Sequence, residues 1–430
     1  MESNVSTDPG SNWAGNHRYQ ASHLYRPQTV AEIQDLVQKL DRVKAVGSRH
    51  CFNDIADSPV AQISTEHLNS VEIDEDAMTV SVGSGLRYGQ FCPELHDAGY
   101  ALHNLASLPH ISVAGAIATA THGSGVKNGN LGTAVSGIEF VAGTGELVTL
   151  DRHDDNDLLN GAIVNLGAIG IVTKIKLDIE RTYSVRQDVF ENLALSELTE
   201  NFDAIMSSGY SVSLFTNWQD QTIDQVWVKR RIAEDMGDMP SELFGAKAAT
   251  DHVKPVSGFS GENRTDQMGI PGPWPERLPH FKMGFTPSIG DELQSEYFVA
   301  AENAVDAILA LDKLHGQIGS LIRVSEIRTI AADDQWLSPF YKQDSVAFHF
   351  TWRPDMPAVL GLLAAIEAEL APYNAVPHWG KVFSTAPEIL RSRHPRFGDF
   401  VSLLDLYDPQ GKFRNNFIDR YFPSDLRRAS

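Results

Sequence analysis

A long segment of small residues, 104–129, constrains the fold of this chain more than any other feature. Glycine, alanine, serine and threonine dominate it, and its few large apolar residues follow neither the period of an amphipathic helix nor that of a strand. The segment fits either a tightly packed helix and loop between two layers, or a wall against a large flat or phosphorylated ligand. Small side chains over so long a run let the backbone approach a ligand closely, which favours the second.

A short strand that ends in a histidine turn is the second feature. Apolar alternation predicts the strand at 43–46, and Gly47 and Ser48 begin a turn that presents the His50 imidazole. Gly47 permits close backbone approach, and the turn amides can face a phosphate. Because most lone histidines are structural or solvated, the turn alone leaves a structural and a functional His50 equally open.

The bulk composition bounds the class of protein. A chain of 430 residues predicts two domains. Lys and Arg number 35 against 56 Asp and Glu, a net charge of −21, which argues against nucleic acid or an anionic membrane as a partner. The two cysteines, Cys51 and Cys92, build neither a disulfide framework nor a CxxC metal site, so no metal is expected.

The sequence also predicts a cytoplasmic protein. Segment 1–10 is polar and has no basic patch that leads into an apolar run, unlike a signal peptide. The longest apolar stretches, such as 358–366, fall short of a membrane span, so no membrane partner is expected.

Local signals predict both helices and strands. Thr29 and Glu32 form a capping box that opens a helix with one apolar face. Tyr88 stands where the Gly83-Ser84-Gly85 motif would need its third glycine, so no nicotinamide site is expected. Strands are predicted at 79–82, 138–142, 146–150, 173–179, 211–216 and 225–229, and a helix is predicted over 300–314.

Polar side chains interrupt three otherwise apolar segments near the C-terminus. Strand alternation places Glu326 and Arg328 on one face, as a structural ion pair or as part of a ligand site. His349 and Thr351 share a face in a strand whose other face is aromatic, and Lys381 follows a glycine. Alone, the segment with His349 and Thr351 fits a half-exposed strand better than a site, and Lys381 fits a solvated lysine. Together they predict a sheet face that suits a hydroxyl-rich substrate, and an external cofactor would have to supply any redox step.

Several long strings resemble the FAD-dependent alditol oxidases, the xylitol and sorbitol oxidases of the vanillyl-alcohol oxidase superfamily. The resemblance covers nearly the whole chain, from 12–16 to 408–413. It is densest in 106–115, in 271–280, in Glu326-Ile327-Arg328 and in His378-Trp379-Gly380-Lys381.

The resemblance implies an α+β fold of the VAO/PCMH type in two domains. The FAD-binding domain would comprise residues 1–183 and be completed by 378–430. The substrate domain would comprise residues 184–377 and be built on a large antiparallel sheet flanked by helices.

In such enzymes FAD is attached covalently to a histidine in a Gly-Ser-Gly-His turn, and His50 occupies that place. Its neutral imidazole would bond to the 8α carbon of the flavin. Arg49 replaces the usual glycine; we expect it to keep ordinary backbone angles and to add a cation near the pyrophosphate, which strengthens FAD binding or shifts the turn. The resemblance assigns the other cofactor contacts to Gly47, Ser48, Cys51, Phe52, Ser107, Ser112, Gly115, Thr119 and Ile171, the last near the adenine.

The same resemblance places a polyol over the flavin ring, bound by Ser107, Glu326, Arg328, Thr351 and Lys381. The primary alcohol at C1 would give a hydride to flavin N5 and its hydroxyl proton to a base, either Lys381 or His349. Lys381, His349, Glu326 and Arg328 are thus the expected catalytic residues. Oxygen would reoxidise the flavin, giving an aldose and hydrogen peroxide. The expected partners are the polyol and O2, and the expected state is a monomer.

Two other functions stay open. An aldonolactone oxidase or dehydrogenase of the L-gulono- or D-arabinono-1,4-lactone type shares the Glu-x-Arg and His-Trp-x-Lys patterns, although Gly380 and the string around Ser107 favour the alditol enzymes. A non-catalytic carbohydrate-binding protein would also suit the acidic surface and the polar sheet face, but it would be colourless.

Overall fold

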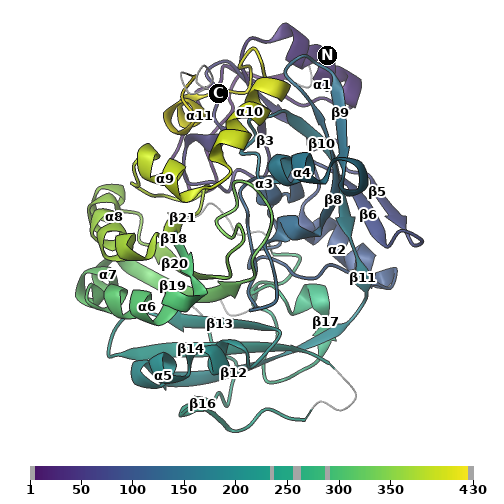
Figure 1. Cartoon of the computed structure of the whole chain (residues 1–430). Coiled ribbons are helices and arrows are strands. Elements are labelled where there is room, and N and C mark those ends of the chain that lie inside the picture. Colours follow the sequence, from purple (N-terminus) through teal and green to yellow (C-terminus); the bar gives the residue numbers. More distant parts are fainter. Residues whose placement is uncertain (1–4, 233–236, 255–262, 286–290, 425–430) are drawn as a thin grey trace.

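The structure, a computed structural model, describes residues 5–232, 237–254, 263–285 and 291–424. The N-terminal part and the C-terminal helices lie together, and a large sheet from the middle of the chain lies beside them (Figure 1). One large buried cluster gathers mainly residues of the first part and the C-terminal helices. A second lies between the large sheet and the helices that cover it.

The first part contains a four-stranded sheet in the order β1-β2-β4-β3, in which β2, β4 and β3 are parallel. Its elements are β1 (Val5–Ser6), β2 (His23–Tyr25), α1 (Val30–Lys39), β3 (Val43–Val46) and β4 (Ala61–Ser64). Thr29 caps α1, since its side chain accepts from the Glu32 N–H at 3.2 Å, and Ile33 and Val37 are buried beneath the helix.

A five-stranded antiparallel sheet in the order β5-β6-β10-β8-β9 completes the first part. Its strands are β5 (Val71–Asp74), β6 (Thr79–Gly83), β8 (Val135–Val141), β9 (Leu147–Asp151) and β10 (Ile171–Asp178). A small pair consists of β7 (Tyr100–Ala101) and β11 (Glu180–Arg181), and the helices are α2 (Tyr88–Asp97), α3 (Val113–Ala118) and α4 (Arg152–Ile163).

Ten strands of the middle part form one antiparallel sheet in the order β15-β16-β12-β14-β13-β19-β20-β18-β21, with β17 beside β12. They are β12 (Ser184–Ala194), β13 (Ser211–Thr216), β14 (Thr222–Arg231), β15 (Glu242–Leu243), β16 (Ala246–Ala248), β17 (Gly272–Pro273), β18 (Leu293–Ala300), β19 (Ile322–Ile330), β20 (Ser345–Trp352) and β21 (Val376–Pro377). Helices α5 (Leu195–Met206), α6 (Ala304–Asp312), α7 (His315–Leu321) and α8 (Met356–Leu370) lie against it (Figure 1). The aromatic face of β20 packs into the cluster under these helices, which leaves the opposite, polar face for the site.

The C-terminal segment returns to the first part of the chain (Figure 1). It contains α9 (Pro387–Arg393), α10 (Phe397–Tyr407) and α11 (Asn416–Tyr421). The Val43 N–H donates to the Lys412 carbonyl at 2.9 Å. The Asn415 amide donates to the carbonyl oxygens of residues 54, 55 and 57, in the loop after the histidine turn. The exact domain boundaries at 183 and 377 stay predictions.

The strands predicted from alternation are confirmed to within a few residues, whereas the helix predicted over 300–314 is wrong at its start. Ala300 ends β18, and α6 begins at Ala304. Seven of the eight residues of β18 are buried, so its two faces do not alternate between apolar and polar as those of a half-exposed strand do.

The α8 helix and the turn after it, 356–373, are long and apolar enough by length and composition to cross a membrane. A buried core helix meets the same criteria, and one face of α8 packs into the cluster above the large sheet. That face consists of Val359, Leu362, Leu363, Ile366 and Leu370. The absence of a membrane partner stays a prediction.

Candidate active site

A cavity of about 590 Å³ is lined by residues of both the first part and the large sheet. Three segments supply most of its walls: the turn after β3, the small-residue segment and the polar face of the sheet. Its size is that of a pocket for a ligand or cofactor, which commonly spans roughly 300–1,000 Å³.

The small-residue segment lines the cavity and also packs as a short helix. The helix, α3, occupies only residues 113–118. A side chain at Gly115 would place its Cβ 2.8 Å from Ser112 Oγ, so the residue has to be small. The wall consists of Ala106, Ser107, Leu108, Ile111, Ser112, Ala114, Gly115, Ala116, Ala118, Thr119, Thr121 and His122.

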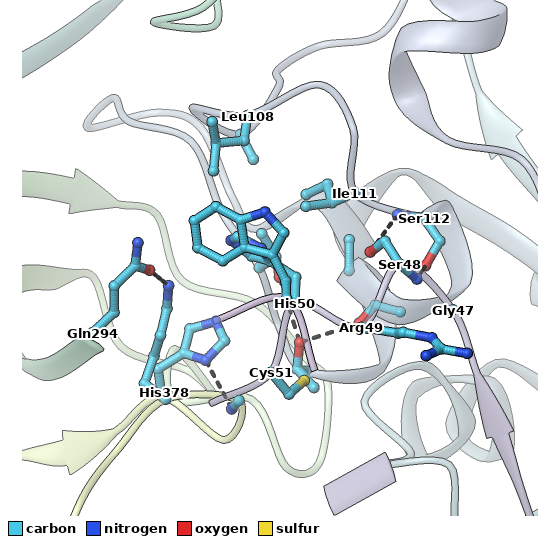
Figure 2. Close-up of a pocket in the computed structure, with 18 of the residues that line it drawn as sticks. Gly47, Ser48, Arg49, His50, Cys51, Leu108, Ile111, Ser112, Gln294 and His378 are labelled. Carbon is cyan, nitrogen blue, oxygen red and sulfur yellow. Dashed lines mark hydrogen bonds between the residues drawn. The ribbon is translucent and has the colours of Figure 1, made fainter. Parts of the chain in front are cut away.

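Two serines join the histidine turn to this wall (Figure 2). The Ser112 N–H donates to Ser48 Oγ at 3.1 Å, and the Ser48 N–H donates to Ser112 Oγ at 3.4 Å. A Cβ at Gly47 would lie 2.3 Å from Ser112 Oγ, so a larger residue would break this arrangement. The glycine predicted to allow close approach therefore does so, toward Ser112.

The backbone of Arg49 corrects an expectation from the sequence. Arg49 has a φ of 61°, in the left-handed region that glycine enters freely, and not the ordinary angles expected of an arginine. Its guanidinium donates to the carbonyl oxygens of Pro9 at 2.5 Å and Ser11 at 3.4 Å, and lies 5.6 Å from the centre of the Tyr19 ring. These contacts stabilise a conformation that costs free energy in a side-chain-bearing residue.

The His50 ring lies among aromatic groups. Its centre is 4.6 Å from that of Trp13, 5.1 Å from His110 and 5.8 Å from Phe52. Nδ1 is buried and has no hydrogen-bond partner within the part of the chain that the structure describes. Burial, with Lys381 nearby, holds the pKa of His50 well below its usual range, so the imidazole is neutral.

Strand register builds the opposite wall. Across three neighbouring strands, Glu296 of β18 pairs with His349 of β20, which pairs with Glu326 of β19. In the next row, Gln294 pairs with Thr351. Because alternate residues of a strand share a face, the register collects the polar residues of all three strands on the cavity side.

Glu296 is the central carboxylate of this wall, and the sequence did not predict its role. It is 2% exposed, and its carboxylate lies 2.6 Å from Arg328, 3.2 Å from His122 Nε2 and 3.5 Å from His349 Nδ1. Burial disfavours its charge, but His122, Arg328 and His349 outweigh burial and hold its pKa well below the usual range. Glu296 is therefore an ionised counterion for Arg328.

Glu326 and Arg328 lie side by side as strand alternation predicted. Glu326 Oε1 is 3.6 Å from Arg328 Nε and 2.8 Å from His280 Nε2. The Arg328 guanidinium also lies 3.5 Å from Ser107 Oγ, which joins the sheet face to the small-residue wall. Burial raises the pKa of Glu326, but Arg328 and His280 outweigh it and the pKa falls below its usual range.

Lys381 lies on a loop that joins the two walls. Its Nζ donates to Gln294 Oε1 (Figure 2 shows Gln294) and lies 5.1 Å from the centre of the Phe52 ring. The Asn53 amide donates to the carbonyl oxygens of Trp379 at 2.8 Å and Lys381 at 2.9 Å. The loop that carries Lys381 is thus fixed by the chain just after the histidine turn.

Fourteen of the predicted site residues line this cavity: Gly47, Ser48, Arg49, His50, Cys51, Ser107, Ser112, Gly115, Thr119, Glu326, Arg328, His349, Thr351 and Lys381. The side chains of two others do not. Phe52 is 2% exposed and packs into the cluster of the large sheet. Ile171 is fully buried under α1, and its neighbours Gly170 and Val172 line the cavity in its place.

Several lining residues escaped the sequence-based prediction: Glu296, Gln294, His122, His280 and His378. Gln294 and Glu296 are two residues apart on β18, but the residue between them, Ser295, is also polar, so the segment shows no clear apolar–polar alternation. His122 follows the small-residue run and His280 ends a proline-rich string, and neither position carries a local pattern.

Family comparisons agree with this division of the site. Residues 21–151, which include the histidine turn and the small-residue wall, match a family of FAD binding domains. Residues 291–421, which include β18, β19, β20 and the Lys381 loop, match the family of D-arabinono-1,4-lactone oxidase. The first match shows an FAD binding domain in this chain.

Relatives align along almost the entire chain. The alditol oxidase of Streptomyces sp. is 43% identical over 413 residues, which cover 95% of this chain and 97% of that protein. The L-gulono-1,4-lactone dehydrogenase of Mycobacterium tuberculosis is 25% identical, over 95% of this chain and 98% of that protein.

Solved structures show the fold. The cholesterol oxidase of B. sterolicum superposes with a TM-score of 0.78 over 97% of each chain, at 14% identity. With the FAD binding domain and the large antiparallel sheet, this likeness confirms the predicted α+β fold of the vanillyl-alcohol oxidase type. By its identity to the Streptomyces enzyme over nearly its full length, the chain belongs to the alditol oxidase family.

Proposed function

We propose that this protein is an FAD-dependent alditol oxidase that converts the C1 primary alcohol of a polyol, such as xylitol or sorbitol, to the aldose while O2 becomes hydrogen peroxide. The observation that carries the proposal is that one cavity is lined by both the His50 turn and the polar sheet face with Glu326, Arg328 and Lys381. The alditol oxidase relative supports the same substrate class.

The residues around the turn fit FAD, and we propose that it is attached through His50. Gly47 and Gly115 leave room for close backbone approach. The neutral, buried His50 Nδ1 lacks a protein partner among the described residues, and a buried polar atom of this kind normally has one. When bound, FAD supplies the acceptor for the hydride, which no side chain of the chain can be.

The sheet face offers the groups that a polyol needs. The ionised Glu326 accepts hydrogen bonds from substrate hydroxyls, and the Arg328 guanidinium and Lys381 ammonium donate them. Thr351 and Ser107 hydroxyls can do either, so vicinal hydroxyls find donors and acceptors in alternation. Since the site is buried, these hydrogen bonds replace water and set the position of C1.

Of the two candidate bases, the geometry favours His349. Burial lowers the pKa of His349 while Glu296 opposes the shift, so the ring is neutral near pH 7. Glu296 lies next to Nδ1 and stabilises a proton there. Nε2, which hydrogen-bonds Thr351 Oγ1 at 3.3 Å, is then unprotonated and can accept the hydroxyl proton of a substrate. Burial also lowers the pKa of Lys381, while Glu296 opposes the shift. In its protonated form Lys381 would first have to lose a proton to act as the base, and it serves better as a cation that stabilises developing negative charge.

The test begins with the purified protein. It should be yellow, and xylitol or sorbitol should yield hydrogen peroxide and the aldose. After acid precipitation and proteolysis, the flavin should stay on the peptide that contains His50. If all the flavin is released, the proposed covalent attachment is refuted, while the proposed oxidase activity still stands. A colourless protein would refute the oxidase activity and favour carbohydrate binding.

A lactone oxidase is the second candidate, because residues 291–421 match the D-arabinono-1,4-lactone oxidase family. The same peroxide assay with L-gulono-1,4-lactone separates the two. A kcat/KM higher for the lactone than for xylitol would refute the alditol proposal in favour of a lactone oxidase. Reduction of a dye without formation of peroxide would indicate a dehydrogenase.

A further inference from the structure

Lys229 is a buried cation that the proposed reaction does not use. It lies on β14 and is 1% exposed. Its Nζ donates to the carbonyl oxygens of Leu278 and Pro279, and no carboxylate of the described residues bonds to it directly. Burial lowers its pKa to about 7, while Glu326 opposes the shift. A buried ammonium is costly, so its position calls for a physical reason.

The third contact of Lys229 leads to the site. Lys229 Nζ lies 3.3 Å from His280 Nδ1, and His280 Nε2 lies 2.8 Å from Glu326 Oε1. Phe215 and Trp227 flank the His280 ring, each with its centre 5.3 Å away, so the ring has little freedom to turn. The three side chains form a continuous chain from β14 to the cavity.

The chemistry of Lys229 sets the direction of these hydrogen bonds. Below its pKa of about 7, Lys229 is an ammonium that only donates, so His280 Nδ1 accepts and the ring proton is on Nε2, which donates to Glu326. The ionised Glu326 requires the same tautomer, because a carboxylate only accepts. Burial lowers the pKa of His280 to about 4, so the ring is neutral. Glu326 Oε1 is thus occupied, and Oε2 has no partner in the described parts of the chain, although Glu326 lines the cavity.

His280 also holds a second predicted substrate contact. Its backbone N–H donates to the Ser107 carbonyl at 3.1 Å, and the Ser107 hydroxyl lies 3.5 Å from Arg328. One residue therefore fixes Glu326 through its ring and the Ser107 loop through its backbone.

We propose that Lys229 and His280 are positioning residues that aim Glu326 at the substrate hydroxyls. His280 holds one carboxylate oxygen so that the other faces the cavity, and Lys229, behind His280 and outside the cavity lining, selects the ring tautomer that can do so. This rests on the proposed function for the identity of the substrate, but not for the geometry.

The variants Lys229→Met, His280→Leu and His280→Gln test the proposal. Loss of the donor to Glu326 should raise the KM for xylitol about tenfold to a hundredfold in His280→Leu. We expect about tenfold in Lys229→Met, with kcat changed less than about twofold in both. His280→Gln should recover part of the loss, because its amide can donate where Nε2 does. Flavin content should stay at the wild-type level in all three.

Lys412→Met is the matched control. Lys412 is 9% exposed and its Nζ donates to the backbone carbonyls of Val37 and Gln38, the same kind of contact away from Glu326. Its KM should equal that of the wild type. Without the Nε2 donor the pKa of Glu326 rises, so the KM of His280→Leu should also increase toward acid pH, which a merely structural defect would not cause.

A crystal structure of Lys229→Met decides the geometry independently of activity. We expect the contact between His280 and Glu326 to be lost or lengthened; an unchanged contact would overturn the role of Lys229. Wild-type KM values in all three variants would overturn the proposed positioning of Glu326 by Lys229 and His280. An equal rise of KM in His280→Leu and His280→Gln would also overturn it. If the wild type makes no peroxide from xylitol or sorbitol, the proposed function fails. The crystal structure of Lys229→Met still tests whether Lys229 holds His280 against Glu326.

Discussion

Replacing Glu296 by glutamine tests the charge balance on which the site depends. The Glu296 carboxylate is buried and lies 2.6 Å from Arg328, 3.2 Å from His122 and 3.5 Å from His349. Glutamine keeps the size and one acceptor oxygen but removes the negative charge. Among the residues that the structure describes, Arg328 would then retain only Glu326, 3.6 Å away, as a carboxylate neighbour.

The expected magnitude follows from these contacts. Removing one partner of a buried ion pair costs about 3–5 kcal/mol. Because glutamine keeps an acceptor and Glu326 still compensates part of the charge of Arg328, we expect the lower end, about 3 kcal/mol of the free energy of unfolding. Such a loss is a large fraction of the roughly 5–15 kcal/mol of a typical domain.

The effect should depend on pH with a definite sign. The folded protein holds the pKa of Glu296 well below its ordinary value of 4.5. Its ionised form therefore adds stability above the unfolded pKa, and this contribution is lost as the pH falls through the folded pKa. Glutamine has no such group, so the difference between wild type and variant should be full at neutral pH and shrink below pH 4.5.

Urea unfolding of the holoenzyme, followed by tryptophan fluorescence, measures the difference. Glu388→Gln is the control, since its side chain is 74% exposed and pairs with Arg391 at 3.1 Å on α9. An exposed pair contributes about 1 kcal/mol or less. If Glu296→Gln and Glu388→Gln unfold at the same urea concentration at neutral pH, or if the deficit of Glu296→Gln stays constant in acid, the reasoning is refuted.

Three further outcomes are expected. Lys381→Met should abolish peroxide formation from xylitol while flavin absorbance per protein stays unchanged; retained turnover would contradict its catalytic role. Gly47→Ala should lower flavin content, since the new Cβ would lie 2.3 Å from Ser112 Oγ, and wild-type content would show that the turn tolerates a side chain. Lys44 is buried and its pKa falls from 10.5 to about 7 by burial, so the unfolded chain binds the extra proton between these values. Stability relative to Lys44→Met should therefore rise with pH in that window; a flat difference in thermal unfolding would contradict it.

Local patterns account for much of the fold and part of the site. Alternation in the segments of Glu326 and His349 was sufficient to predict β19 and β20 and the side on which their polar groups lie. Most of β18 is buried on both faces, so its sequence shows no clear alternation of apolar and polar residues. For this reason Gln294 and Glu296 were not predicted as site residues. A residue that acts through register with a strand far along the chain leaves little trace in its own neighbourhood.

Side-chain partners explain the remaining differences. Arg49 adopts a left-handed backbone because carbonyl groups of residues 9 and 11 bind its guanidinium, and those contacts join segments with no pattern in common. Lys229 and His280 meet because β14 and the segment around residues 278–280 pack together, which composition and spacing do not encode. Tertiary packing, more than propensity, decides such positions.

The bonds from Asn53 to the Lys381 loop have a consequence for biosynthesis. They join residues 326 and 328 positions apart, so the cavity cannot close until almost the whole chain has left the ribosome. Hairpins such as β13–β14 can pair much earlier, because their partners are close in sequence. Closure of the cavity is therefore a late event in synthesis, which cannot precede the appearance of the Lys381 loop.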